Sequence, residues 1–200
     1  WTFTTTGSYN TSHQTLPNQV NKNVTHSNNG AFDAKISYML MRDQVQKNTV
    51  EFRVGKRFVK AWNNVLEQHI DQPQSYRNVT FAEWSWLHRR YLGAAKFDLT
   101  ATYRKGVPWL GSLDDTTTRY MIPDQNFIDG ILHYDLKIID ATFSMPFLLF
   151  GQSANYSINF HGQFTQTRQD SANMMSIGGR YNVRGFDGAT TLLAEQGYYG

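Results

Sequence analysis

Apolar and polar residues alternate with a period of two along most of this chain. The stretch 95–104 shows the pattern most clearly, because every odd-numbered residue is apolar or aromatic and every even-numbered residue is polar or charged. Successive side chains of a β-strand point to opposite faces, so this pattern predicts a strand with different environments on its two sides. The same alternation recurs in 1–9, 33–40, 50–58, 82–86, 132–138 and 155–164.

Two positions interrupt the alternation. Lys56 falls in the apolar file of its strand, where we expect it to mark the interface end of the strand. The apolar phase also slips by one residue at Ile138 and Ile139. A single inserted residue in one strand of a pair produces such a slip, so we predict a β-bulge at this point.

The connections between these strands alternate in length. Short connections lie at 42–48, 89–93 and 150–154, and long polar ones lie at 10–30, 63–75 and 106–130. Barrels that cross a bacterial outer membrane have short periplasmic turns and long extracellular loops. This rhythm predicts that the short connections are periplasmic and the long ones extracellular.

Composition narrows the class of protein. No run of residues approaches the roughly 18 apolar positions that a membrane helix needs, which excludes a helical membrane protein but not a barrel. Aromatic residues make up 14% of the chain, as expected for girdles at two membrane interfaces. The chain has 0 Cys, so it holds no disulfide and no thiolate site. The net charge of +3 is spread without a basic block, which argues against nucleic-acid binding.

Motifs of catalysis are missing from the sequence. The histidines are too far apart for a local metal motif, and neither a G-x-S-x-G elbow nor a phosphate-binding P-loop occurs. We therefore predict no enzyme activity, no catalytic residue, no metal and no cofactor. His133 and His161 lie on polar faces, where a hydrogen-bonding role is the simplest interpretation.

A glycine-rich segment near the end of the chain stands apart from the strand pattern. Arg184 lies between Val183 and Gly185, and glycines flank this group on both sides within 178–188. Glycine permits positive φ and close backbone approach, so the arginine is placed in a tight turn with apolar neighbours. A plain glycine-rich hairpin loop with a solvated arginine is the alternative.

This segment resembles a known loop. Ser176 to Gly179 running into Val183-Arg184-Gly185-Phe186 is similar to the signature of the sixth extracellular loop in polypeptide-transporting outer-membrane barrels. The segments 38–43 (YMLMRD), 88–93 (HRRYLG), 101–106 (ATYRKG) and 196–199 (QGYY) follow in family order. Together they resemble the two-partner secretion transporters, the TpsB family of ShlB, FhaC and HecB.

The resemblance implies a fold and a function. We expect an all-β, antiparallel transmembrane β-barrel, with residues 1–200 forming about seven strands of one 16-stranded barrel domain through the sixth extracellular loop. The POTRA domains and the closing strands are expected outside this chain. Such a barrel exports a large exoprotein of the TpsA type across the outer membrane of a Gram-negative bacterium without ATP. The expected surroundings are outer-membrane lipid and lipopolysaccharide, and the expected state is a monomer.

The resemblance also implies site residues. The lock of the inward-folded loop is Val183, Arg184, Gly185 and Phe186, and its hinges are Gly178, Gly179 and Gly188. Charged side chains of the polar files are expected to line the water-filled lumen. They are Glu51, Arg53, Arg57, Lys96, Asp98, Arg104, Asp135, Lys137 and, with them, His161.

Two other functions fit the same pattern. A barrel-assembly insertase similar to BamA shares the Val-Arg-Gly-Phe loop but folds clients into the membrane. A soluble β-barrel that binds a ligand inside also alternates, with its apolar face turned inward. Charges of both signs on neighbouring strands favour a water-filled lumen over the soluble alternative.

Overall fold

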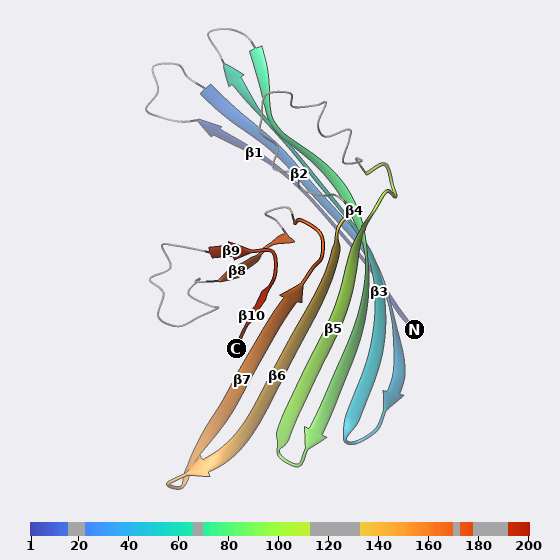
Figure 1. The fold of residues 1–200 in the computed structure, drawn as a ribbon, viewed down its shortest axis with the longest axis vertical. Coiled ribbons are helices and arrows are strands. Elements are labelled where there is room, and N and C mark those ends of the chain that lie inside the picture. The colour runs from blue at the N-terminus through green and yellow to red at the C-terminus, as the bar shows by residue number, and fades with distance from the viewer. Residues whose placement is uncertain (16–22, 66–69, 113–132, 170–172, 178–191) are drawn as a thin grey trace.

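The computed structural model describes residues 1–15, 23–65, 70–112, 133–169, 173–177 and 192–200, and they form β-structure (Figure 1). Eight strands make one antiparallel sheet in the order β1-β2-β3-β4-β5-β6-β7-β10, and β8 pairs with β9 separately. The large sheet contains β1 (Thr2–Thr15), β2 (Asn23–Arg42), β3 (Gln46–Val65), β4 (Ile70–Leu92), β5 (Ala95–Val107), β6 (Asp135–Leu149), β7 (Gln152–Phe164) and β10 (Gly197–Tyr199). The small pair is β8 (Met175–Ile177) and β9 (Leu192–Ala194). No helix in these ranges is long and apolar enough to cross a membrane.

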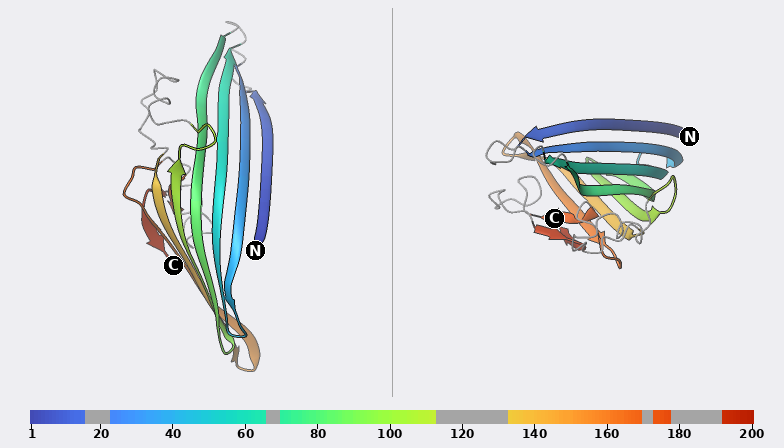
Figure 2. Two further views of the ribbon diagram at one scale, coloured as in Figure 1. Left: turned by 90° about the vertical axis from the view of Figure 1, so that its right-hand side faces the viewer. Right: turned by 90° about the horizontal axis from the view of Figure 1, so that it is seen from above.

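The large sheet curves, and the β8–β9 pair lies on its concave side (Figures 1 and 2). The side-chain amide of Gln163 on β7 donates hydrogen bonds to the carbonyls of Asn173 at 2.8 Å and Glu195 at 3.1 Å. These carbonyls belong to the segments next to β8 and β9. The face that carries Gln163 is therefore the concave face.

The register between strands extends the assignment of faces to the whole sheet. Directly opposed residues share a face in neighbouring strands. The row that contains Gln163 continues through Ile138, Thr102, Ser85, Glu51 and Ser37, all of them concave. The adjacent row is convex and contains Phe3, Ile36, Phe52, Trp84, Tyr103 and Lys137.

The two faces differ in burial in a way that inverts the usual soluble arrangement. Glu83 on the concave face is 8% exposed, whereas its neighbour Trp84 on the convex face is 45% exposed. The convex face also exposes Phe3, Phe32, Ile36, Tyr38, Trp86, Ile139, Met145, Phe147, Tyr156, Ile158, Phe160 and Phe164. A soluble barrel buries its apolar face inside. This sheet presents its apolar face outside.

The three predicted short connections lie at one end of the sheet, as Figure 1 shows, and each has a local cause. In the β2–β3 turn, a carboxylate oxygen of Asp43 accepts hydrogen bonds from the backbone N–H groups of Val45 at 2.8 Å and Gln46 at 2.7 Å. These bonds favour the ionised carboxylate, so they lower the pKa of Asp43. The side chain thereby fixes the turn.

The other two short turns depend on positive φ. Gly93 in the β4–β5 turn has φ 65°, a conformation that glycine adopts without steric cost. In the β6–β7 turn both Phe150 (φ 51°) and Gly151 (φ 79°) are left-handed. Positive φ at both central residues is the mark of the type I′ turn, whose twist matches that of the flanking strands.

Two expectations about the strands were wrong. The polar stretches predicted as loops at 10–30 and 63–75 are partly strand, because β1 continues to Thr15, β2 begins at Asn23, β3 continues to Val65 and β4 begins at Ile70. No bulge occurs at Ile138, where β6 pairs in continuous register with both β5 and β7. The irregularities lie instead between Met39 and Met41 on β2, and between Ala61 and Trp62 on β3.

Candidate functional site

The concave face is organised around one aromatic ring. Phe81 on β4 lies directly opposite Gly55 on β3, and it is 5% exposed. A Cβ atom at Gly55 would lie 2.3 Å from Phe81 Cζ and 2.7 Å from an oxygen of Asp33. Only a residue without a side chain leaves room for the ring here. The glycine therefore places Phe81 flat against the sheet.

Three arginines surround this ring. The guanidinium carbons of Arg53, Arg57 and Arg104 lie 5.5, 5.3 and 4.9 Å from the Phe81 centroid. A guanidinium within about 6 Å of an aromatic face is attracted by the ring quadrupole. Three strands, β3, β4 and β5, thus contribute to one cluster, which we call the Phe81 cluster.

Two carboxylates connect the arginines. Asp33 on β2 binds Arg53 at 2.8 Å and Arg57 at 2.9 Å. Glu83 on β4 binds Arg104 at 2.6 Å and Arg53 at 3.5 Å. Since Arg53 contacts both carboxylates, the five side chains form one continuous network across β2 to β5.

Further charges of the concave face are also paired. Glu51 binds Lys35 at 3.2 Å and accepts a hydrogen bond from Ser37 at 2.9 Å. Nearer the short turns, Asp98 binds Arg89 at 2.6 Å and Lys96 at 2.6 Å.

The last pair joins β6 and β7. His161 Nδ1 lies 2.6 Å from an oxygen of Asp140, the residue directly opposite it in the register. With these contacts, every carboxylate named on this face has a basic partner.

This arrangement suits a hydrated wall better than a reaction centre. Arginine stays charged at all physiological pH values and binds carboxylates through a rigid fork, so the network keeps its charges fixed and both carboxylates paired, with one positive charge in excess. Among the described residues, no group of histidine, aspartate and glutamate is placed to hold a metal ion. The concave face can therefore hold water and pass polar groups along it.

Seven of the nine predicted lumen residues share the concave face: Glu51, Arg53, Arg57, Lys96, Asp98, Arg104 and His161. The placement of Asp135 and Lys137 with them was wrong. Lys137 lies opposite Tyr103, and Asp135 lies opposite Lys105, both on the convex face.

The prediction for Asp135 and Lys137 failed because an apolar cluster packs against the Phe81 ring. Tyr134 and Leu136 are buried with Phe81, and Ile138 packs against them. These apolar residues face inward, whereas an amphipathic pattern predicts that they face outward. The slip of phase that suggested a bulge is this change of environment along β6.

Sequence reasoning left several residues of this face out of the predicted site. They are Asp33, Lys35, Gly55, Phe81, Glu83 and Asp140. Alternation already placed Asp33, Lys35 and Glu83 in polar files, and this signal was sufficient to include them. For Phe81, the signal is the apolar pair Phe81-Ala82, which breaks the period of two.

The predicted loop lock lies outside the described residues. This applies to Val183, Arg184, Gly185 and Phe186 and to the hinges Gly178, Gly179 and Gly188. The described residues nearest to it are those of β8 and β9, on the concave side.

A curved antiparallel sheet with an exposed apolar convex face and a charged concave face defines part of an outer-membrane β-barrel. The profile of the family described as "Haemolysin secretion/activation protein ShlB/FhaC/HecB" matches residues 1–200. The chain belongs to this family, whose members are transporters, and it is part of an outer-membrane protein.

Individual relatives support the assignment to this family. "Outer membrane transporter CdiB-2" of Burkholderia pseudomallei (strain 1026b) is 34% identical over 167 residues, covering 76% of this chain and 27% of that protein. "Outer membrane transporter CdiB" of Dickeya dadantii (strain 3937) is 24% identical over 151 residues, covering 76% of this chain and 25% of that protein. This chain therefore spans about a quarter of each curated relative.

Solved structures show the same fold. CdiB from Acinetobacter baumannii matches with a TM-score of 0.74 at 24% identity, over 98% of this chain and 32% of that chain. CdiB from Escherichia coli matches with a TM-score of 0.78 at 16% identity, over 98% of this chain and 34% of that chain.

Proposed function

We propose that this chain forms part of the wall of an outer-membrane pore that exports a large exoprotein of the haemolysin, adhesin or filamentous haemagglutinin type in two-partner secretion. The observation that carries the proposal is the inverted burial of the sheet, with Glu83 inside and Trp84 outside. The matched family is one of secretion proteins, which favours export over membrane insertion of clients.

The orientation follows from the turns. Short turns are periplasmic in outer-membrane barrels, so the end of the sheet with the turns at 43–45, 93–94 and 150–151 faces the periplasm. The convex face then contacts lipid and the concave face lines the lumen. We treat the pore as a monomer, with POTRA domains and further strands supplied by the rest of the protein.

The paired charges allow a polypeptide to pass through the lumen without strong binding. An extended polypeptide that passes the Phe81 cluster meets side chains that are already bound to oppositely charged neighbours, with three arginines for two carboxylates. A lone wall charge in a confined lumen would hold an oppositely charged segment of the exoprotein. Pairing weakens such a trap and keeps the wall wettable, so passage needs no strong binding step.

Arg184 acts as the lock of the sixth extracellular loop. In this proposal the loop folds into the lumen, and the guanidinium binds a carboxylate of the barrel wall through its planar fork. The glycines at 178, 179 and 188 permit the tight path of the backbone. Removing the arginine leaves a partly buried acid without its partner, at a cost of about 3 to 5 kcal/mol when water is excluded.

The test is secretion by point variants at equal membrane abundance. Arg184→Ala is expected to keep near-normal amounts of heat-modifiable barrel and lose most exoprotein secretion, because the strand ladder does not depend on the loop. Arg184→Lys is expected to recover part of the secretion. Arg180→Ala, in the same segment, is the matched control and is expected to be mild. Normal secretion by Arg184→Ala contradicts the lock.

A further inference from the structure

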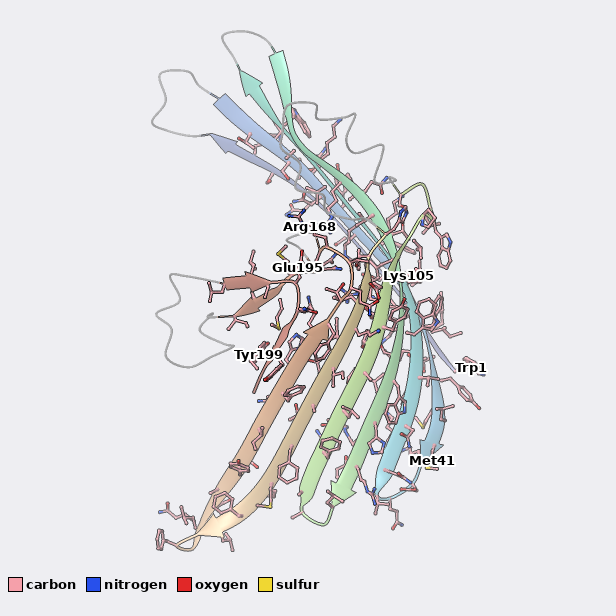
Figure 3. The ribbon with its side chains drawn as sticks, viewed as in Figure 1. Trp1, Met41, Lys105, Arg168, Glu195 and Tyr199 are labelled. Carbon is pink, nitrogen blue, oxygen red and sulfur yellow. The ribbon has the colours of Figure 1, made fainter. Side chains whose placement is uncertain are left out.

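Three lysines lie on the convex face at the end of the sheet away from the short turns. Lys137 on β6 is opposite Tyr103, Lys105 on β5 is opposite Ala82, and Lys56 on β3 is opposite Phe32. Figure 3 labels Lys105 at this end of β5 and Met41 at the other end of the sheet, next to a short turn.

The three lysines lie at nearly the same height along the barrel axis. Lys56 and Lys105 are about 11 residues from the short turns of their hairpins, and Lys137 is about 13 residues from its own. With a rise of about 3.3 Å per residue and a strand tilt of about 40°, these separations correspond to roughly 28 to 33 Å along the barrel axis. The hydrocarbon core of a bilayer is about 30 Å thick. The three ammonium groups therefore lie at the headgroup level of the outer leaflet.

Below this level the convex face is largely apolar, with its polar residues near the short turns. In β3 to β6, the convex side chains between the short turns and the three lysines carry no fixed charge except Arg90, beside the β4–β5 turn. The lysines thus form a separate cationic band above a surface that contacts lipid tails.

The lysines of this band also differ from the concave basic groups in their partners. Within the described ranges, neither Lys105 nor Lys137 forms an ion pair, and Lys56 donates a hydrogen bond to the backbone carbonyl of Leu110. Asp135, opposite Lys105 in the register, accepts a hydrogen bond from the hydroxyl of Thr167 at 3.2 Å. Among the described residues the band therefore has an excess of positive charge, so its complement is an anion.

A groove leads down from Lys137 into the apolar surface. Its volume is about 460 Å³, and its convex lining includes Trp84, Trp86, Ala101, Tyr103 and Ile139 as well as Lys137. Ala101 leaves a depression between the larger aromatic side chains. A groove with apolar walls and an ammonium group at its upper end matches an amphiphile with an acyl chain below and an anionic group above.

We propose that Lys56, Lys105 and Lys137 bind the phosphate groups of the outer-leaflet glycolipid, lipopolysaccharide, with an acyl chain in the groove beneath Lys137. This site rests on the orientation given under the proposed function. It adds a lipid ligand that the export function does not require. Each lysine close to a charged lipid surface contributes to the attraction, so the three act together.

The test uses the full-length protein purified in detergent and three lipids: bisphosphorylated lipid A, the same lipid A without phosphates, and phosphatidylglycerol. Native mass spectrometry measures the lipid retained, and a thermal melt measures the stabilisation as a function of lipid concentration. The variant is Lys56→Gln/Lys105→Gln/Lys137→Gln. The matched control is Lys47→Gln/Lys96→Gln, which removes two lysines from the concave face.

The wild-type protein and the control are expected to retain the bisphosphorylated form and not the dephosphorylated one. The triple variant is expected to bind the bisphosphorylated form at least about tenfold more weakly. Equal binding by the triple variant and the control overturns the site, and so does equal retention of phosphatidylglycerol by the wild type. Secretion of the exoprotein is measured separately in cells, so loss of lipid binding with normal secretion leaves the export function intact.

Discussion

The two faces of this sheet are stabilised in different ways, although the same strands form both. On the concave face, Glu83 is 8% exposed and bound to two arginines. One residue further along β4, Trp84 is 45% exposed on the convex face, and its ring stacks on Tyr103 at 5.9 Å. The concave face is held by charge pairs and the convex face by cross-strand aromatic contacts.

The difference shows how the solvent selects the side chains. A charge beside water in a narrow lumen needs a fixed partner, and arginine provides it through several directional hydrogen bonds. A charge beside lipid tails is expensive, so the convex face keeps its lysines at the headgroup level, where a flexible stem reaches the interface. Alternate residues of the same strands are therefore suited to water on one face and to lipid on the other.

The two faces are expected to differ most when the same charge is placed on each face of β5. Leu99→Arg is expected to destabilise the barrel by about 2 to 4 kcal/mol, because the guanidinium would lie in the lipid near the bilayer midplane. Thr100→Arg, the adjacent residue, is expected to be nearly neutral, since its side chain enters water. The check is a refolding titration into lipid vesicles, in which equal effects at both positions contradict the assignment of faces.

Two glycines under aromatic rings test how firmly each face is packed. A Cβ atom at concave Gly55 would lie 2.3 Å from the Phe81 ring, and one at convex Gly30 would lie 2.3 Å from the Phe58 ring. Phe81 is held by three arginines, whereas Phe58 stacks on Tyr9 and can turn outward from the convex face. We expect Gly55→Ala to cost about 1 to 3 kcal/mol and Gly30→Ala less than about 1 kcal/mol.

The measurement for this glycine pair is the midpoint of urea unfolding in lipid vesicles. A larger cost at Gly30 than at Gly55 shows that the concave ring is the more adaptable one and that the Phe81 cluster is loosely held.

Effects smaller than that of Gly55→Ala are expected within the concave network itself. Glu83→Gln leaves Arg53 and Arg104 without their shared carboxylate, and the 10% exposure of the Glu83 side chain limits rescue by water. We expect a loss of about 1 to 2 kcal/mol, below that of a dry ion pair because the arginines are partly exposed. Glu51→Gln, at 19% exposure with one lysine partner, is expected to cost less than about 1 kcal/mol. Equal unfolding midpoints for the two variants contradict the ranking.

The strand order and the assignment of most side chains to a face follow from the sequence because alternation reports the environment of each strand directly. In β5, the odd and even residues of 95–104 were assigned to the correct faces without structural information. The short turns were also located, since Asp43, Gly93 and Gly151 are residues with a specific turn chemistry.

Alternation fails where one face changes character along a strand. Tyr134, Leu136 and Ile138 are apolar and concave because they pack with Phe81, a contact between β4 and β6 that no local pattern encodes. The same limit applies to the pairing of Arg53 with Asp33 and Glu83. Alternation places charges on a face, but the register between strands decides which charges meet.

Site-directed spin labelling distinguishes a concave face in water from a convex face in lipid. The chain has 0 Cys, so single cysteines can be introduced at 99, 100, 101, 102 and 103 on β5 and at Leu136 and Ile139 on β6. In lipid vesicles, labels at 99, 101, 103 and 139 are expected to be accessible to oxygen, which concentrates in lipid. Labels at 100 and 102 are expected to be accessible to a water-soluble nickel complex, and the label at 136 to neither. Uniform access of the nickel complex along β5, or lipid exposure at 136 with water exposure at 139, would contradict this assignment of the faces.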